Sequence, residues 1–434
     1  MEPLTLGILG IAALVVLLVL GMQVAYASAL VGTVGMISLI GFKPALGAVG
    51  LMPYEQLAAY PLSVLAMFIL IGYLAYHANL TQGAFDAMRK WWGWLPGGLA
   101  VSSVFAAAAF AAVSGSSTST AAIFSKVAIP EMLKAGYHKG FAAGVVAAGG
   151  TLASLIPPSG ILVIYAIIVE ESVGRLLLGG LIPGILSALV YAAAIIIRVR
   201  INPALAPKTQ SATWGERVHS IKDIWGIALV ISIVIGGIYS GWMSPVESGA
   251  VGAFIILLLA LANKMGFKGL TDALGDTART AIMVLTIVWC ILIMVRFLGY
   301  SGLPSQIEAW VLSLDVSPFW ILIAILLMYA ILGMFIDAIG MLLLTLPFVH
   351  PIITSLGYDA IWFGIIVVKM VEIGLITPPI GINVFVVGGI RPDIPLMSIF
   401  RGIWWFFVCD VVTIGILIAF PQIVLWLPNN MIGG

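Results

Sequence analysis

Two Pro-Pro pairs interrupt stretches of the chain that are otherwise apolar enough to cross a bilayer: Pro157-Pro158 and Pro378-Pro379. Proline donates no backbone N–H and its ring clashes with the preceding turn, so a helix breaks there. In lipid, the carbonyl groups freed by a break are costly unless protein covers them or they line a wet cavity. Two broken spans in corresponding positions of one chain indicate a transporter binding site. The alternative is a proline kink in each span.

The residues at these breaks carry oxygen atoms that suit a monovalent cation. Broken helices in transporters use their carbonyl ends to hold coupling ions such as Na⁺. We expect Ser159 and Asn383, at the same breaks, to contact substrate. The candidate Na⁺ ligands are Gly150, Thr151, Ser154, Pro157 and Pro158 in the first break, and Thr377, Pro378 and Gly381 in the second.

The most polar intramembrane segment is Ser114–Thr120, which joins two short apolar arms. Because each arm is short for a span, we predict a re-entrant helical hairpin at about 97–132 with its tip inside the membrane. Hydroxyl groups and the free N–H groups of the second arm would form an anion site. The alternative is that small residues only allow helices to pack closely. The candidate substrate ligands are Ser114, Gly115, Ser116, Ser117 and Thr118, of which Ser116 is also a Na⁺ candidate.

A second hairpin is expected at about 318–354, with Asp337 at its tip. An ionisable residue inside the membrane indicates a functional site, so Asp337 is a candidate for Na⁺, for substrate or for a proton relay. The alternative is a carboxylate that caps a helix. Lys369 and Glu372 lie three residues apart on one helix face and are expected to pair. Three other charged residues stand alone in the sequence and receive no role: Lys126, Arg296 and Asp410.

The composition restricts the class of protein. Of the 434 residues, 62% are hydrophobic and only 9% are charged, whereas a soluble domain carries about a quarter charged residues. The apolar runs are continuous rather than alternating, which argues against a membrane barrel. We therefore predict an all-α polytopic membrane protein. Its first apolar run follows Met1-Glu2-Pro3 without a basic segment, so it is expected to be a retained span rather than a cleaved signal peptide.

The chain contains an internal repeat. Pro378 lies 221 positions after Pro157, and the same offset relates Pro130 to Pro351 and Gly160 to Gly381. We divide the chain into a first repeat, 1–213, a cytoplasmic linker end, 214–223, and a second repeat, 222–434. The broken spans occupy about 139–169 and 360–390.

Each repeat has five crossings and one hairpin, so the odd number of crossings inverts the second repeat. The basic segment 198–223 is expected in the cytoplasm by the positive-inside rule, which places both termini outside. The first hairpin then enters from the cytoplasm and the second from outside. Inverted repeats of this kind are found in alternating-access carriers.

The combined motifs resemble a known family. These are the Ser-Gly-Ser tip, the run from Pro130 to Tyr137, the run from Gly150 to Ser159, and Ile376 to Asn383. Together they resemble the large membrane subunit of tripartite ATP-independent periplasmic (TRAP) transporters, over nearly the whole chain. The resemblance implies an elevator-type fold like that of the ion transporter superfamily. It also adds Gly340, beside Asp337, to the candidate substrate ligands.

The resemblance further implies a bacterial inner-membrane permease without enzymatic activity that imports organic acids such as dicarboxylates, sialic acid or keto acids by Na⁺ symport. The partners would be a soluble periplasmic substrate-binding protein and a separate small membrane subunit of about four spans. The Na⁺ would be the coupling ion, and no organic cofactor is expected.

Other readings remain open. One is a self-sufficient Na⁺- or H⁺-coupled carboxylate carrier that needs no binding protein. A second is an intramembrane hydrolase that uses a hairpin serine, although no general base lies near that serine in the sequence. A third is a passive channel, which opposed hairpins would obstruct.

Overall fold

The computed structural model describes residues 2–78, 80–207 and 212–431, and every regular element in these ranges is helical. Seven of the described helices are long and apolar enough to cross a membrane, and further apolar helices are shorter. The all-α membrane class expected from composition is therefore found.

The first half of the chain forms α1 to α10, with two short irregular turns after α3. α3 ends at Met52, and a π-helical turn and a 3-10 turn lead into α4. The helices are α1 (Pro3–Val19), α2 (Val24–Ile40), α3 (Phe42–Met52), α4 (Ser63–His77), α5 (Leu80–Trp92), α6 (Gly98–Ser114), α7 (Ser117–Lys134), α8 (Lys139–Thr151), α9 (Gly160–Ile168) and α10 (Val173–Ile201).

The second half forms α11 to α20. Its second helix begins with a capping box in which Ser244 and Glu247 satisfy each other's backbone N–H groups. The helices are α11 (Trp214–Tyr239), α12 (Pro245–Ala262), α13 (Phe267–Ser301), α14 (Leu303–Leu312), α15 (Pro318–Gly333), α16 (Ala338–Ser355), α17 (Ala360–Ile376), α18 (Ile382–Ile390), α19 (Leu396–Ala419) and α20 (Gln422–Asn429).

Both Pro-Pro pairs stand at helix interruptions. Helix α8 ends at Thr151, a 3-10 turn follows at Leu152–Ser154, and α9 starts only at Gly160. In the second half, α17 ends at Ile376 and α18 starts at Ile382. The first interruption contains one 3-10 turn and separates helices of 13 and 9 residues, and the second separates helices of 17 and 9 residues.

Helix starts recur at the offset seen in the sequence. Helices α7 and α16 each have 18 residues and start at 117 and 338, which is 221 positions apart. Helices α2 and α12 start at 24 and 245, again 221 positions apart. Corresponding helices of the two halves thus follow one another in the same order along the chain.

Four helices were not expected from the sequence, namely α3, α5, α14 and α20. Arg89 and Lys90 lie in helix α5, and Glu308 lies in helix α14. These helices are too short to span a bilayer, so a search for about 20 apolar residues passes over them.

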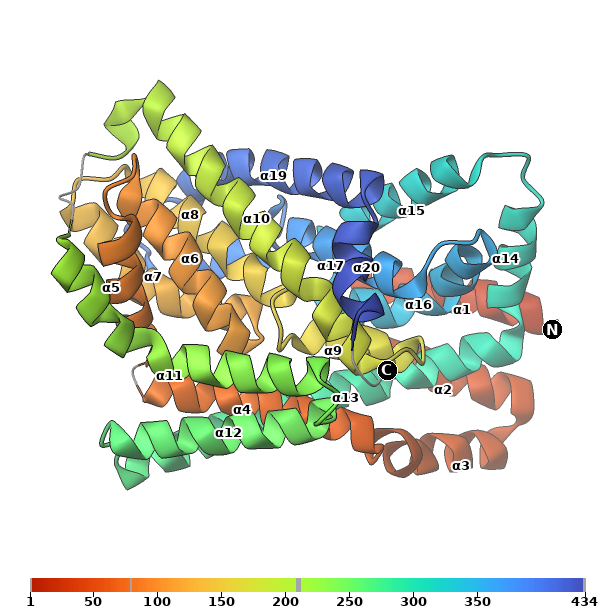
Figure 1. Ribbon diagram of the computed structural model, residues 1–434. Coiled ribbons are helices and arrows are strands. Elements are labelled where there is room, and N and C mark those ends of the chain that lie inside the picture. Colours follow the sequence, from red (N-terminus) through yellow and green to blue (C-terminus); the bar gives the residue numbers. More distant parts are fainter. Residues whose placement is uncertain (1, 79, 208–211, 432–434) are drawn as a thin grey trace.

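The helices form two groups (Figure 1). Helices α4, α11, α12 and α13 pack together along the lower side of the view, and α2 continues this group along α13. The hairpin helices and the interrupted helices lie above them. Helices α5 to α8 gather at the left end and α14 to α16 at the right end, so the two hairpins come from opposite ends.

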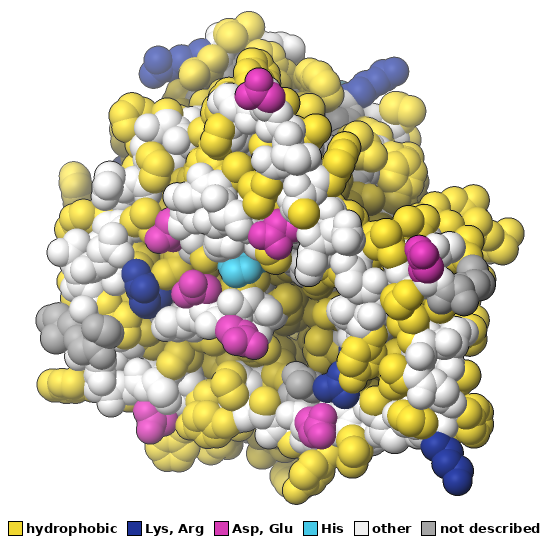
Figure 2. Space-filling model, turned by 90° about the vertical axis from the view of Figure 1, so that its right-hand side faces the viewer, with side chains coloured by type: hydrophobic (Ala, Val, Ile, Leu, Met, Phe, Trp, Pro, Cys, Tyr) yellow, Lys and Arg dark blue, Asp and Glu magenta, His cyan; other side chains and the backbone are white. Residues whose placement is uncertain are grey.

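The right-hand end of the molecule is rich in acidic side chains (Figure 2). Asp and Glu side chains gather around a histidine on this face, between large hydrophobic areas. The opposite end carries basic residues such as Lys134, which pairs with Glu131 at 2.8 Å, and Arg89. The two ends therefore differ in charge.

One helix crossing depends on two glycines without side chains. A Cβ atom on Gly374 of α17 would lie 2.6 Å from the carbonyl oxygen of Gly333 at the end of α15. Backbone atoms cannot yield as a side chain does, so only glycine allows this approach. The crossing holds the second hairpin on the second interrupted helix.

We predict that Gly374→Ala lowers the melting temperature of the purified protein, because overpacking costs about 1–3 kcal/mol. The matched control is Gly275→Ala in α13, where an added Cβ meets nothing within 4 Å. Equal melting temperatures for the two variants would show that the crossing tolerates a side chain.

Candidate functional site

The tip of the first hairpin is a compact polar turn. Gly115 has φ +58° and ends α6, while the side chain of Ser116 caps α7 by accepting from the N–H of Ser119. The hydroxyl groups of Ser114 and Thr120 lie 2.8 Å apart, and the Thr120 hydroxyl donates to the Ser116 carbonyl at 2.9 Å. The hydroxyl groups thus tie the tip to itself.

This tip rests on the first interrupted helix. A Cβ on Gly115 would lie 2.5 Å from the carbonyl oxygen of Pro158, and one on Gly150 would lie 3.0 Å from the carbonyl oxygen of Ser117. The two glycines let the backbones approach closely. The structure therefore brings the first hairpin and the first break together, as a shared site requires.

Asn383 connects the second break to the same place. Its amide Nδ2 donates to the hydroxyl of Ser117 at 2.9 Å and to the carbonyl of Ala147 in α8 at 3.2 Å. Its Oδ1 atom is buried and has no hydrogen-bond partner among the described residues. One side chain thus joins α18 to α7 and α8 and keeps a buried acceptor available.

The first break is closed by its own hydroxyl groups. Ser159 donates to the carbonyl of Ser154 at 2.6 Å, and Thr151 donates to the carbonyl of Ala148 at 2.7 Å. Pro157 and Pro158 are buried, and the buried Ser154 Oγ has no hydrogen-bond partner in the described part of the chain. Ser154 Oγ and Asn383 Oδ1 are buried oxygen atoms of the type that bind a hard cation.

The second break is more open. Thr377 donates to the carbonyl of Ile373 at 2.6 Å, and Gly381 adopts φ +55° before α18. Pro378 and Pro379 are exposed on the surface of this chain. The two breaks share their helix geometry but differ in how well protein covers them.

Asp337 makes a local contact at the tip of the second hairpin. Its carboxylate accepts a hydrogen bond from the N–H of Gly340 at 3.0 Å and so caps α16. Asp337 is thus a carboxylate that caps a helix, and its second carboxylate oxygen takes no part in that hydrogen bond. A Cβ on Gly340 would lie 2.8 Å from that oxygen, so the glycine keeps the cap compact.

A cavity of about 200 Å³ lies beside the first hairpin tip. The start of α7 lines it, with Ser116, Ser119 and Lys126 at helical spacing. Its other polar lining residues are Ser114, Thr280, Tyr73 and Tyr76. Lys126, which stands alone in the sequence, shares this cavity with the tip hydroxyl groups. The cavity therefore combines one cation with several hydroxyl groups.

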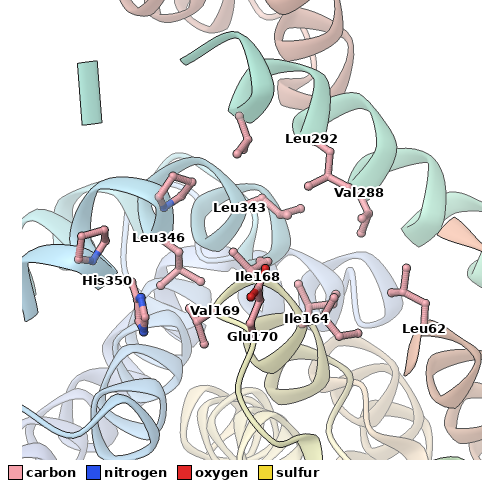
Figure 3. Close-up of a pocket in the computed structure, with 14 residues that line it drawn as sticks. Leu62, Ile164, Ile168, Val169, Glu170, Val288, Leu292, Leu343, Leu346 and His350 are labelled. Carbon is pink, nitrogen blue, oxygen red and sulfur yellow. The ribbon is translucent and has the colours of Figure 1, made fainter. Parts of the chain in front are cut away.

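A second cavity, of about 330 Å³, opens between α9, α13 and α16 (Figure 3). Its lining is apolar apart from Glu170 and His350, with Leu292 and Leu343 pointing inward from facing helices. Because it lacks the hydroxyl groups of the hairpin tip, we regard the smaller cavity as the better candidate for a polar substrate.

A buried charged network lies behind the two breaks. The Nζ atom of Lys369 is 2.6 Å from Glu372 Oε2 and 2.8 Å from Asp410 Oδ1. The pairing of Lys369 with Glu372 is confirmed, whereas the interpretation of Asp410 as isolated is wrong. Arg296 is likewise not isolated, since it lies 3.6 Å from Glu55. Sequence spacing cannot reveal partners that lie on different helices.

We predict that Gly115→Ala lowers the melting temperature more than Gly302→Ala does. Both positions have left-handed backbone, φ +58° and +68°, which costs an alanine about 1–2 kcal/mol. Only Gly115 has a neighbour, Pro158, that a Cβ would strike. The same loss of stability in both variants would mean that the close contact of Gly115 with Pro158 does not contribute to stability.

Several known proteins are similar to this chain. The family model of the tripartite ATP-independent periplasmic transporter, DctM component, matches residues 11–423. The C4-dicarboxylate TRAP transporter large permease DctM of Pseudomonas aeruginosa is 33% identical, over 92% of this chain and 93% of that protein. The sialic acid large permease SiaM of Vibrio cholerae is 31% identical, over 86% and 87%. The sialic acid permease SiaT of Haemophilus influenzae is 30% identical, over 87% of this chain and 61% of that protein.

The fold is also similar to a solved structure. The YdaH transporter of Alcanivorax borkumensis superposes with a TM-score of 0.60 at 14% identity, over 88% of this chain and 90% of that one. This likeness concerns the fold alone. The sequence matches go further: the chain belongs to the DctM family of TRAP transporters, and it is a multi-pass large permease component of a secondary transporter rather than an enzyme.

Proposed function

We propose that this chain is the bacterial inner-membrane permease of a Na⁺-driven importer of small organic acids. The observation that carries the proposal is the junction at Ser117 and Asn383, where the first hairpin, α8 and the second interrupted helix meet. Oxygen atoms from distant parts of the chain thus gather inside one membrane protein, as carriers with broken helices require. Relatives named for dicarboxylate and for sialic acid transport support the substrate class.

We assign the coupling cation to the two breaks. Ser154 Oγ and Asn383 Oδ1 are buried acceptors without a hydrogen-bond partner among the described residues, and the Thr151 and Thr377 side chains lie in the same segments. The inward Na⁺ gradient and the membrane potential would supply the work, the potential at about 2.3 kcal/mol per charge per 100 mV. The other candidates in the breaks would contribute backbone carbonyl groups: Gly150, Pro157, Pro158, Pro378 and Gly381. Two further candidates lie at the hairpin tips, Ser116 and Asp337.

We assign the substrate carboxylate to the cavity beside the first hairpin tip. Lys126 supplies the charge, and the hydroxyl groups of Ser114, Ser116 and Ser119 supply hydrogen bonds. Hydrogen bonds to a charged group contribute about 1.5–3 kcal/mol each, more than neutral ones. The hydroxyl-rich tip thus holds the acid while Lys126 selects for its charge.

We further propose that the halves 1–213 and 222–434 are inverted repeats in an elevator-type carrier. The opposite directions of the two hairpins in Figure 1 and the equal helix spacing support this division. The basic end of the molecule would face the cytoplasm, and the acidic face of Figure 2 and both termini would face the periplasm.

We propose two protein partners. The SiaT relative is longer than the portion that matches this chain, which supports a separate small membrane subunit that takes the place of the extra portion. A soluble periplasmic binding protein would deliver substrate to the acidic face. Selectivity among organic acids would then reside largely in that soluble partner.

Uptake of labelled organic acids into proteoliposomes tests this function. The chain is co-purified with its small membrane subunit and measured with and without a Na⁺ gradient and with and without the binding protein. We expect uptake only when both are present. Uptake with Na⁺ alone would instead identify a self-sufficient carrier, and uptake driven by a proton gradient would overturn the assignment of Na⁺.

A second experiment tests the role of Lys126. We predict that Lys126→Met raises KM for the organic acid about tenfold, which corresponds to about 1.4 kcal/mol, with little change in maximal rate. Lys134→Met is the control, because Lys134 lies on the same helix but pairs with Glu131 at the exposed end. If both variants change KM equally, the cavity is not the carboxylate site.

A further inference from the structure

The buried network around Lys369 has an imbalance of charge. Its three ionisable members, Lys369 and Glu372 of α17 and Asp410 of α19, have fully buried side chains. One ammonium group faces two carboxyl groups. If both carboxyl groups were ionised, the network would carry one uncompensated negative charge in the protein interior, which is strongly unfavourable.

The ammonium group has two close carboxylate partners. It donates a hydrogen bond to Glu372 Oε2 at 2.6 Å and lies 2.8 Å from Asp410 Oδ1, and the ring centre of Tyr191 is 5.5 Å from Nζ. Both contacts of Lys369 are to the inner oxygen atoms of the carboxyl groups, Glu372 Oε2 and Asp410 Oδ1.

Those two oxygen atoms have no other donor in the described part of the chain. Glu372 Oε1 and Asp410 Oδ2 are both buried without a hydrogen-bond partner. The carboxyl groups differ on their inner side, because Asp410 Oδ1 also accepts from the hydroxyl of Tyr191 at 2.6 Å. Asp410 thus has two donor groups within 2.8 Å, the Tyr191 hydroxyl and the Lys369 ammonium, and Glu372 has one.

Other titratable groups from the helices packed against α17 do not remove the imbalance. Cys409 neighbours Asp410 in sequence and is a buried free thiol. The hydroxyl of Tyr165 donates to the carbonyl of Ala360, and that of Tyr329 accepts from Thr345. None of these groups supplies a positive charge.

We propose that this network is a proton-binding site and that Glu372 carries the proton. Hydrogen bonds to an ionised carboxylate favour the ionised form, so Asp410, with two donors, keeps its charge and Glu372, with one, takes the proton. The network is then neutral as a whole. None of its three ionisable members is among the proposed Na⁺ or substrate ligands, and the proposal does not depend on the coupling ion.

The network lies close to the ends of α8 and α17, the helices that precede the two breaks. Asp410 reaches Tyr191, and the Tyr191 hydroxyl lies 3.4 Å from that of Thr151 at the end of α8. Glu372 lies on α17, one turn before the helix ends. The protonated network therefore connects the helices that lead into both breaks.

Infrared spectroscopy of the purified transporter tests the proposal directly. A protonated carboxyl group absorbs at a higher frequency than a carboxylate, and its band shifts in D₂O. We expect Glu372→Gln to lose a protonated-carboxyl band equivalent to one group and to keep the carboxylate absorption. The control, Glu247→Gln at the exposed start of α12, should lose carboxylate absorption only.

A second variant, Asp410→Asn, tests the proposal independently in case Glu372→Gln does not fold. In Asp410→Asn, the remaining Glu372 becomes the only counter-charge of Lys369 and should ionise, so the protonated-carboxyl band should again disappear. Loss of carboxylate absorption in Glu372→Gln or in Asp410→Asn, with no change in the protonated-carboxyl band, would overturn the proposal. That result would mean that both groups are ionised and that another cation balances them.

Discussion

The backbone of a membrane protein must satisfy its polar groups without help from water, and this constraint governs the whole structure. Two helices that break inside the protein create free carbonyl and N–H groups. The chain covers the first break with a hairpin that approaches through Gly115 and Gly150. The candidate site lies where unpaired backbone groups of a broken helix are covered by close contact with segments far apart in sequence.

The sequence predicted the parts of the site better than their contacts. Prolines and a hydroxyl-rich run are local signals, so both interruptions and the turn at Ser114–Thr120 could be located without a structure. The contact of Asn383 with Ser117 spans 266 positions, and no local pattern encodes it. Lys126 could have been found, because it lies seven residues after Ser119 and so on the same helix face.

The errors have a common physical origin. Length and apolar content identify elements that cross the bilayer, but α5 and α14 lie outside that rule because they are short. Likewise, Asp410 has no charged neighbour in the sequence, because its partners Lys369 and Tyr191 come from two other helices. Solitary charges in apolar spans are better interpreted as members of pairs whose partners are unknown.

The junction between Asn383 and Ser117 also has a consequence for synthesis. The 266 positions between these two residues mean that the first hairpin is translated and inserted long before its partner leaves the ribosome. Until then the Ser117 hydroxyl and the Ala147 carbonyl lack the amide that later binds both. The first half of the chain must therefore persist in the bilayer as an unfinished intermediate, and a truncated chain that ends before α18 cannot assemble the site.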